Sequence, residues 1–170
     1  MTLFPVEPPK LAPIHLKPCE LVVSKEPCEV TTVLGSCVAV TMFNARSGLA
    51  AICHAMLPAP GQGRCPGANS HDPYKFVSCV VPAMADTFRR VGLNPAEIEV
   101  KMFGGANLIN RHSGRICTNC VGPSNVRLAS LLLEQENLRV CASNVGGCRG
   151  RKIVFNTLTG EVMHRHLTPS

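Results

Sequence analysis

Residues 31–40, TTVLGSCVAV, contain the clearest structural signal in the chain. Two apolar runs rich in β-branched residues are joined there by the three small residues Gly35, Ser36 and Cys37. β-Branched residues favour strands, and small residues let the backbone turn sharply. The stretch therefore predicts two strands joined by a tight turn, with Cys37 at the turn among exposed backbone N–H groups.

Short β-rich runs separated by turn residues continue on both sides of this stretch. The predicted strands are residues 21–23, 30–34, 38–43, 49–56, 98–102, 138–142, 152–156 and 161–167. Residues 44–48 predict a hairpin loop, and residues 58–73, rich in Gly, Pro and Asn, predict a long surface loop of the kind that often borders a site.

Two further segments repeat apolar side chains at helical spacing. The first follows residues 72–73, Asp-Pro, which predict its cap and first turn, and it ends at Gly92. The second runs from residues 123–124 to Asn137. The pattern predicts a single α+β domain, strand-rich with about seven or eight strands, and two main helices packed on the sheet.

Composition excludes several classes of protein. The 170 residues are 45% hydrophobic, which suits one soluble domain. The 17 basic and 11 acidic residues give a net charge of +6, but they are scattered, so the sequence does not predict nucleic-acid binding through a basic stripe. There is no apolar run of about 18 residues to cross a membrane. Residues 1–18 contain five prolines and are expected to form a flexible leader.

The chain has ten cysteines, an even number that would suit a secreted disulfide framework. The proline-rich N-terminus does not resemble a signal peptide, so we expect a reducing cytoplasm in which thiols are packing residues, nucleophiles or metal ligands. Cys117 and Cys120 form a C-x-x-C pair, which is half of a zinc site. Cys141 and Cys148 are candidates for the other half, and free thiols, a zinc or redox site and a disulfide all remain open.

Cys37 is the candidate nucleophile, because free N–H groups at a turn favour a thiolate and can hold an oxyanion. A thiol also needs a base, and His54 is the candidate. The competing interpretation is a buried packing cysteine with a structural histidine. Cys53 is a rival nucleophile, but it is adjacent to His54 in a predicted strand and therefore points to the opposite face.

The predicted hairpin decides whether Cys37 and His54 meet. If Phe43 pairs with Leu49, Cys37 lies opposite the residue after His54. A single bulge at Gly48 would place the thiol and the imidazole directly opposite each other, with Cβ atoms about 5 Å apart.

Residues 31–40, together with ICHAMLP at 52–58, closely resemble the chemoreceptor glutamine deamidase family, CheD. The family pattern is a Thr, then LGSCVAV, then a His in an H-x-M-L-P run, and Cys37 and His54 have the family's separation of 17 positions. Three further segments resemble family motifs: KMFGGAN at 101–107, VGPSNV at 121–126 and GGCRGR at 146–151. The resemblance covers roughly residues 15–168.

The resemblance implies a deamidase domain over residues 19–170 that hydrolyses side-chain amides of particular glutamines on methyl-accepting chemotaxis receptors. Cys37 would be the nucleophile, His54 the base and Thr31 the third member of a triad. The resemblance also implies a cytoplasmic enzyme that needs no metal or other cofactor, and an interaction with the chemotaxis phosphatase CheC.

Five residues around the predicted turns are candidates for contact with the substrate: Ser36, Gly104, Gly105, Arg149 and Arg151. The two glycines of each turn are expected to shape a shallow groove, and the two arginines to pair with acidic receptor residues. Two other functions remain open. One is a module that binds receptors or CheC without turnover, and the other is a receptor methylesterase, since both hydrolyses pass through an acyl-thioester.

Overall fold

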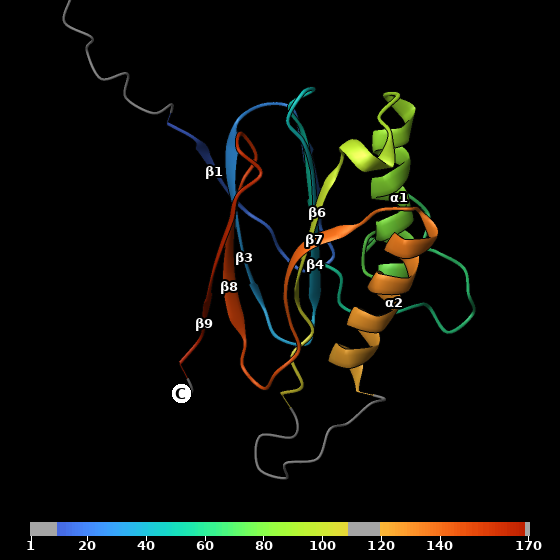
Figure 1. Ribbon diagram of the computed structural model, residues 1–170. Coiled ribbons are helices and arrows are strands. Elements are labelled where there is room, and N and C mark those ends of the chain that lie inside the picture. The colour runs from blue at the N-terminus through green and yellow to red at the C-terminus, as the bar shows by residue number, and fades with distance from the viewer. Residues whose placement is uncertain (1–9, 109–119, 169–170) are drawn as a thin grey trace, which may run out of the picture.

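Two β-sheets lie face to face, and both long helices cover the outer face of one of them (Figure 1). The computed structural model describes residues 10–108 and 120–168. One sheet has the order β1-β3-β8-β9, with β1 (Ala12–His15), β3 (Cys28–Leu34), β8 (Arg151–Asn156) and β9 (Val162–His166). The other has the order β2-β5-β4-β6-β7, with β2 (Leu21–Ser24), β5 (Leu49–Cys53), β4 (Val38–Asn44), β6 (Glu99–Gly104) and β7 (Val140–Val145).

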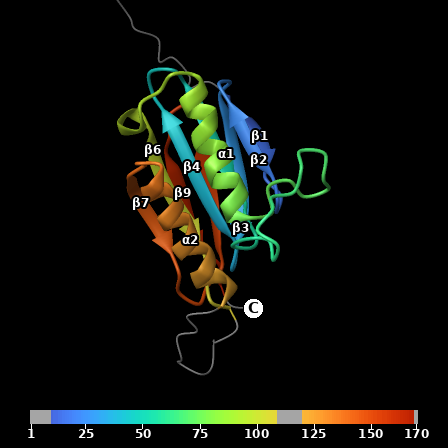
Figure 2. The ribbon, with the colours of Figure 1, turned by 90° about the vertical axis from the view of Figure 1, so that its right-hand side faces the viewer.

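Helices α1 (Val77–Arg90) and α2 (Val121–Gln135) pack on the five-stranded sheet, as Figure 2 shows from the helical side. A short 3₁₀ helix, η1 (Pro95–Glu97), precedes β6. The α+β prediction is confirmed, with nine strands in the described residues instead of seven or eight. None of the helices within residues 10–108 and 120–168 is long and apolar enough to cross a membrane.

The additional strand is β1, which the sequence assigned to the proline-rich leader. Residues 12–15 pair in parallel with residues 28–31 of β3. Pro13 fits there because β1 is an edge strand, where a missing N–H costs no interior ladder bond. The expectation of a leader is therefore wrong for residues 12–15, and residues 1–9 lie outside the described part of the chain.

The start of α1 also differs from the prediction. The Asp-Pro pair at residues 72–73 does not cap the helix, which begins at Val77 with Phe76 as its N-cap residue. Phe76 instead forms a parallel bridge with Leu57. The backbone between the loop and the helix is thus held by this bridge to the segment after β5.

Strands β4 and β5 are buried along their whole length because the five-stranded sheet is covered on both faces. Alternate side chains point to opposite faces of a strand. In β4, Val38, Val40 and Met42 therefore join the core beneath the helices. Ala39 and Phe43 join the second core, between the two sheets. This alternation decides which side chains reach the site described below.

The β4–β5 hairpin is one residue tighter than expected. Phe43 pairs with Ala50, and Asn44 pairs with Leu49, so neither the Phe43–Leu49 register nor the bulged alternative occurs. Gly48 closes the loop at φ +68°, and its N–H donates to the Asn44 carbonyl at 3.0 Å. Gly48 belongs to the turn and forms no bulge.

Cys65 and Cys79 form a disulfide that ties the long loop to α1, which differs from the expectation of free thiols. Cys120 is also disulfide-bonded, and Cys117 lies outside the described residues. The free cysteines of the described segments are Cys19, Cys28, Cys37, Cys53, Cys141 and Cys148.

Candidate active site

Cys37 and His54 lie on neighbouring strands and face the same side. The register of the hairpin continues to an antiparallel bridge between Val38 and Ala55, each of which donates a backbone hydrogen bond to the other. Cys37 and His54 each precede one member of that pair, so both side chains point into the space between the sheets. They are diagonal neighbours, for which Cα atoms are typically about 7–8 Å apart, and no hydrogen bond joins them in the described structure.

A hydrogen-bond chain fixes the tautomer of His54. Thr32 Oγ1 donates to the Leu16 carbonyl at 2.7 Å and lies 2.8 Å from His54 Nδ1. A hydroxyl has one proton, and the carbonyl, which can only accept, takes it. Thr32 Oγ1 must therefore accept from Nδ1–H. The other ring nitrogen, Nε2, keeps its lone pair and is buried with no hydrogen-bond partner among the described residues.

The residue that orients His54 is thus Thr32, and the prediction that Thr31 does so is wrong. Val30, Thr32 and Leu34 are buried on the inner face of β3, whereas Thr31 points to the other face. The Thr31 carbonyl accepts the Leu16 N–H at 2.9 Å and has no hydrogen bond to His54.

Burial sets the charge states of the two reacting groups. Burial lowers the pKa of His54 from 6.5 to about 4, although Glu20 opposes the shift, and His15 adds to it. Burial and the neighbouring Cys19 thiol raise the pKa of Cys37, despite the opposing effect of its own backbone N–H. The resting pair at neutral pH is therefore a thiol and a neutral imidazole, not the thiolate expected from the turn alone. Cys53 is fully buried with its pKa raised to about 12, so it is a packing residue.

The lowered pKa of His54 predicts a pH-dependent stability. Between pH 6.5 and about 4, an unfolded chain binds a proton at His54 that the folded chain excludes. The free energy of unfolding should therefore fall as the pH falls through this window, with His54 contributing at most about 3 kcal/mol. Urea unfolding of the wild type and of His54→Gln, above and below this window, measures the contribution. The wild type should lose more stability on acidification, and equal losses in both proteins would contradict the burial of a neutral imidazole.

Three amide donors hold the carbonyls of the Gly35-Ser36-Cys37 turn. The Ala106 N–H donates to the Gly35 carbonyl at 2.8 Å, and the Gly105 N–H donates to the Cys37 carbonyl at 2.7 Å. The middle carbonyl, that of Ser36, accepts from Asn125 Nδ2 at 2.9 Å. Among the described residues, the N–H groups of Ser36 and Cys37 donate to no carbonyl.

Asn125 is a site residue that the sequence reasoning missed. It is fully buried on α2, and its Nδ2 also donates to the Met56 carbonyl at 3.0 Å. The signal was present, since the buried stripe of α2 consists of Gly122, Asn125, Ala129 and Leu133. A polar amide in an otherwise apolar or small-residue stripe needs a buried hydrogen-bond partner.

Gly104 and Gly105 lie against the Cys37 turn but are buried, so the prediction that they contact the substrate is wrong. A Cβ at Gly104 would lie 2.2 Å from the Cys37 carbonyl oxygen, and one at Gly105 would lie 2.2 Å from a methyl group of Val126. Their φ angles, +103° and +65°, also favour glycine. Both glycines therefore allow the end of β6 to approach the turn from behind.

Arg151 is structural as well, although the sequence predicted a substrate contact. Its side chain is 1% exposed, and its guanidinium donates to the carbonyls of Asn144 and Gly146. Burial lowers its pKa. Arg151 therefore holds the turn after β7 together and has no face for a receptor carboxylate. Arg149, on the same turn, is exposed and remains a candidate contact.

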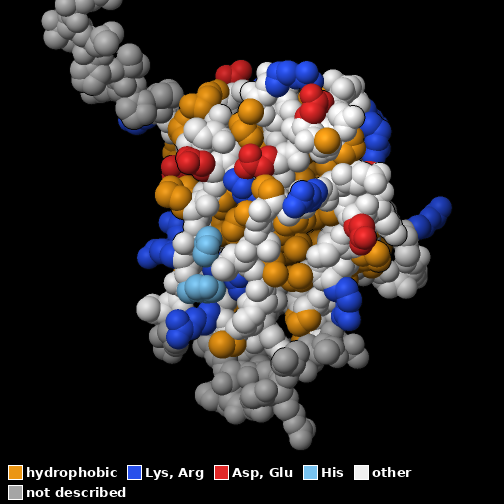
Figure 3. Space-filling model, in the orientation of Figure 1, with side chains coloured by type: hydrophobic (Ala, Val, Ile, Leu, Met, Phe, Trp, Pro, Cys, Tyr) orange, Lys and Arg blue, Asp and Glu red, His pale blue; other side chains and the backbone are white. Residues whose placement is uncertain are grey.

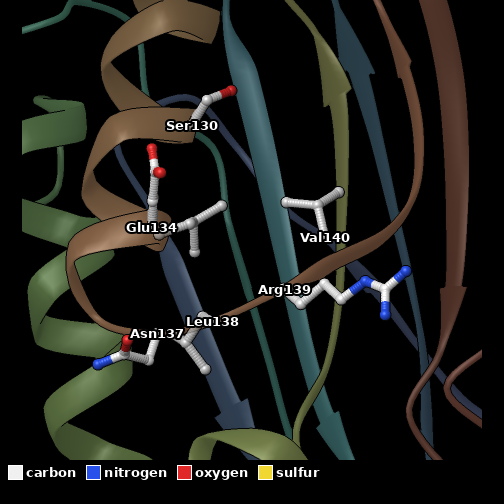
Figure 4. Close-up of a pocket in the computed structure, with 7 residues that line it drawn as sticks. Ser130, Glu134, Asn137, Leu138, Arg139 and Val140 are labelled. Carbon is white, nitrogen blue, oxygen red and sulfur yellow. The ribbon is translucent and has the colours of Figure 1, made fainter.

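The main grooves formed by the described residues are lined by residues other than Cys37 and His54. A groove of about 510 Å³ lies between α2 and the start of β7, with Leu133, Leu138 and Val140 among its lining residues (Figure 4). In the space-filling view, apolar side chains gather near the middle of one face, and basic side chains are dispersed around it (Figure 3). No group of three or more potential metal ligands occurs in residues 10–108 and 120–168.

Comparison with known proteins gives a consistent result. The family model described as CheD chemotactic sensory transduction matches residues 56–166. The chain is 42% identical over 159 residues to "Probable chemoreceptor glutamine deamidase CheD 2" of Geobacter sulfurreducens, a match that covers 94% of this chain and 92% of that protein. It is 43% identical over 152 residues to "Probable chemoreceptor glutamine deamidase CheD" of Oleidesulfovibrio alaskensis, covering 88% of this chain and 70% of that protein. The chain belongs to the CheD family.

Proposed function

We propose that this protein is a glutamine deamidase that converts particular glutamine side chains of chemotaxis receptors to glutamate and releases ammonia. Relatives that match most of the chain have names that state this activity. The observation that carries the chemistry is the fixed tautomer of His54. Its buried Nε2 has a free lone pair on the same face as the Cys37 thiol.

The first half of the reaction forms a thioester. Cys37 Sγ attacks the carboxamide carbon while His54 Nε2 takes the thiol proton, so no free thiolate has to exist beforehand. The N–H groups of Ser36 and Cys37 stabilise the oxyanion of the tetrahedral intermediate. The C–N bond then breaks, and the imidazolium returns the proton to the leaving nitrogen as ammonia departs.

The second half of the reaction releases the product. A water molecule gives a proton to His54 Nε2 and attacks the thioester carbon, forming a second oxyanion in the same place. The C–S bond breaks, the Cys37 sulfur takes back the proton, and the side chain leaves as glutamate. One water is consumed and one ammonia is formed for each glutamine.

Thr32 is expected to act as a positioning residue in this cycle. Thr32→Val keeps the shape but removes the acceptor for Nδ1–H, so the proton is free to move to Nε2, where it blocks the base. Loss of one buried hydrogen bond of about 1–2 kcal/mol predicts a roughly tenfold fall in kcat. Thr31→Val, one residue away on the outer face of β3, is the matched control. Steady-state ammonia release measures both, and equal effects of the two variants would contradict the assignment of Thr32.

The substrate is expected to be the surface of a receptor helix in the cytoplasm. Binding energy from a protein surface positions the glutamine, so free glutamine should react slowly. Arg149 is exposed on the turn between β7 and β8 and is proposed to pair with acidic receptor side chains. An interaction with the CheC phosphatase also remains a prediction.

The proposed function is tested by measuring ammonia release from a purified cytoplasmic receptor fragment, with free glutamine as the control. A much higher kcat/KM for the fragment supports the proposal. Comparable values would indicate a small-molecule amidase. No ammonia, with tight binding of the fragment, would indicate a binding module without turnover.

A further inference from the structure

In the Gly35-Ser36-Cys37 turn, the direction of each hydrogen-bonded carbonyl determines the direction of the N–H group that follows it. In a planar trans peptide unit, the C=O and the following N–H point in opposite directions. The Ser36 carbonyl and the Cys37 N–H belong to the same unit. Because Asn125 Nδ2 holds this carbonyl from the α2 side, the Cys37 N–H must point away from α2.

We infer that Asn125 is a positioning residue that aims the Cys37 N–H at the developing oxyanion, a role that rests on the proposed function. The neighbouring peptide units are held by backbone donors, Ala106 N–H and Gly105 N–H. The peptide unit between Ser36 and Cys37 is held by the side chain of Asn125. A substitution of Asn125 can therefore change the orientation of this unit without changing the sequence of the turn.

A second hydrogen bond fixes the position of the Asn125 side chain. Nδ2 donates to Ser36 O at 2.9 Å and to Met56 O at 3.0 Å, so one amide joins the turn of the nucleophile to the segment that follows His54. Two carbonyl acceptors use both protons of the amide nitrogen and fix which end of the side chain is nitrogen. Asn125 is fully buried, so it does not touch the substrate itself.

The packing of α2 explains why an asparagine on this helix reaches the turn. A Cβ at Gly122 would lie 2.4 Å from the Ala106 carbonyl oxygen and 2.7 Å from that of Gly105. The first turn of α2 is therefore pressed directly against the backbone segment that holds the other two carbonyls. Asn125, about one helical turn further on, is brought within reach of Ser36.

Two reactions of Cys37 distinguish whether Asn125 orients the Cys37 N–H toward the oxyanion or stabilises the whole site. Acylation by p-nitrophenyl acetate passes through a tetrahedral oxyanion and needs the N–H groups. Alkylation by iodoacetamide displaces iodide at a CH₂ carbon and forms no oxyanion, but it still depends on the thiol and on His54 as base. The ratio of the two rates reports on the oxyanion site alone.

Asn125→Asp keeps the shape, removes both donors and places a carboxylate against two carbonyls. Asn125→Ala removes the donors without adding charge, in case the buried carboxylate prevents folding. Misaiming one oxyanion donor predicts a roughly 10- to 100-fold fall in acylation rate and in kcat for the receptor fragment. Alkylation and KM should stay within about twofold of the wild type. Asn137→Asp, at an exposed position after α2, is the matched control.

The outcomes distinguish this inference from the proposed function. Equal losses of acylation and alkylation in a folded variant would overturn it, because Asn125 would then support the whole dyad. Unchanged acylation would overturn it as well. Acylation that depends on Asn125 in a protein that deamidates no receptor fragment would uphold the oxyanion role and refute the proposed substrate.

Discussion

Cys37→Ala and Cys37→Ser are both expected to abolish deamidation. Without the thiol there is no thioester. A serine hydroxyl is far less acidic and less nucleophilic than a thiol, and His54 is oriented here by the Thr32 hydroxyl and not by a carboxylate that would strengthen it as a base. Cys37 is partly buried at its turn, whereas Cys53 is fully buried with a strongly raised pKa. Ammonia release from the receptor fragment is the measurement.

The matched control for this prediction is Cys141→Ala. Cys141 is a free and exposed thiol on β7, outside the residues that form the site, so its removal should leave the rate nearly unchanged. A folded Cys37→Ala protein that still releases ammonia at a substantial rate would refute the assignment of the nucleophile.

Replacing His54 is expected to have the second-largest effect. His54→Gln removes the base that takes the thiol proton, and loss of a general acid–base group typically costs about 10²- to 10⁴-fold in rate. Alkylation of Cys37 by iodoacetamide should slow as well, because His54 is the only base assigned to the thiol. Both rates are measured at neutral pH.

His71→Gln is the control for this substitution, since His71 is exposed in the long loop. If Cys37 reacts equally fast with and without His54, the two residues do not act as a dyad. The pH profile adds a second check. The acid limb of kcat/KM should lie near pH 4, the lowered pKa of His54, and not near pH 6.5.

The central hairpin could be predicted from the sequence because its determinants are local. Apolar runs of strand length and a short polar loop at residues 44–48 are sufficient to define β4 and β5. The register could not be predicted to the residue, because it depends on how Asn44 and Gly48 close the loop. Strand β1 was missed because a short segment with Pro13 becomes a strand only by pairing with β3.

The alternation of buried and exposed side chains along β3 and β8 indicates which face a residue occupies, which the residue type alone does not. On β3, buried Val30 and Leu34 place Thr32 on the inner face beside His54. On β8, the buried Ile153 shares its face with Arg151, which is therefore a core residue and not a contact for acidic partners. In both cases the period of the strand was a better guide than the chemistry of the side chain.

Asn125 illustrates what the sequence could not provide. A helical stripe can show that the residue is buried, but its partners, the carbonyls of Ser36 and Met56, lie 89 and 69 positions away in the chain. Only the packing of α2 on the five-stranded sheet brings them together. The candidate nucleophile and base were thus predictable, and the hydrogen-bond partners of Asn125 were not.

The most direct test of the proposed mechanism is mass spectrometry of a receptor cytoplasmic fragment treated with the enzyme in water enriched in oxygen-18. Wild-type protein should convert specific glutamines to glutamates that each carry one labelled oxygen, and Cys37→Ala should convert none. Loss of methyl groups from a methylated fragment, with every glutamine intact, would contradict the proposal and identify a methylesterase instead.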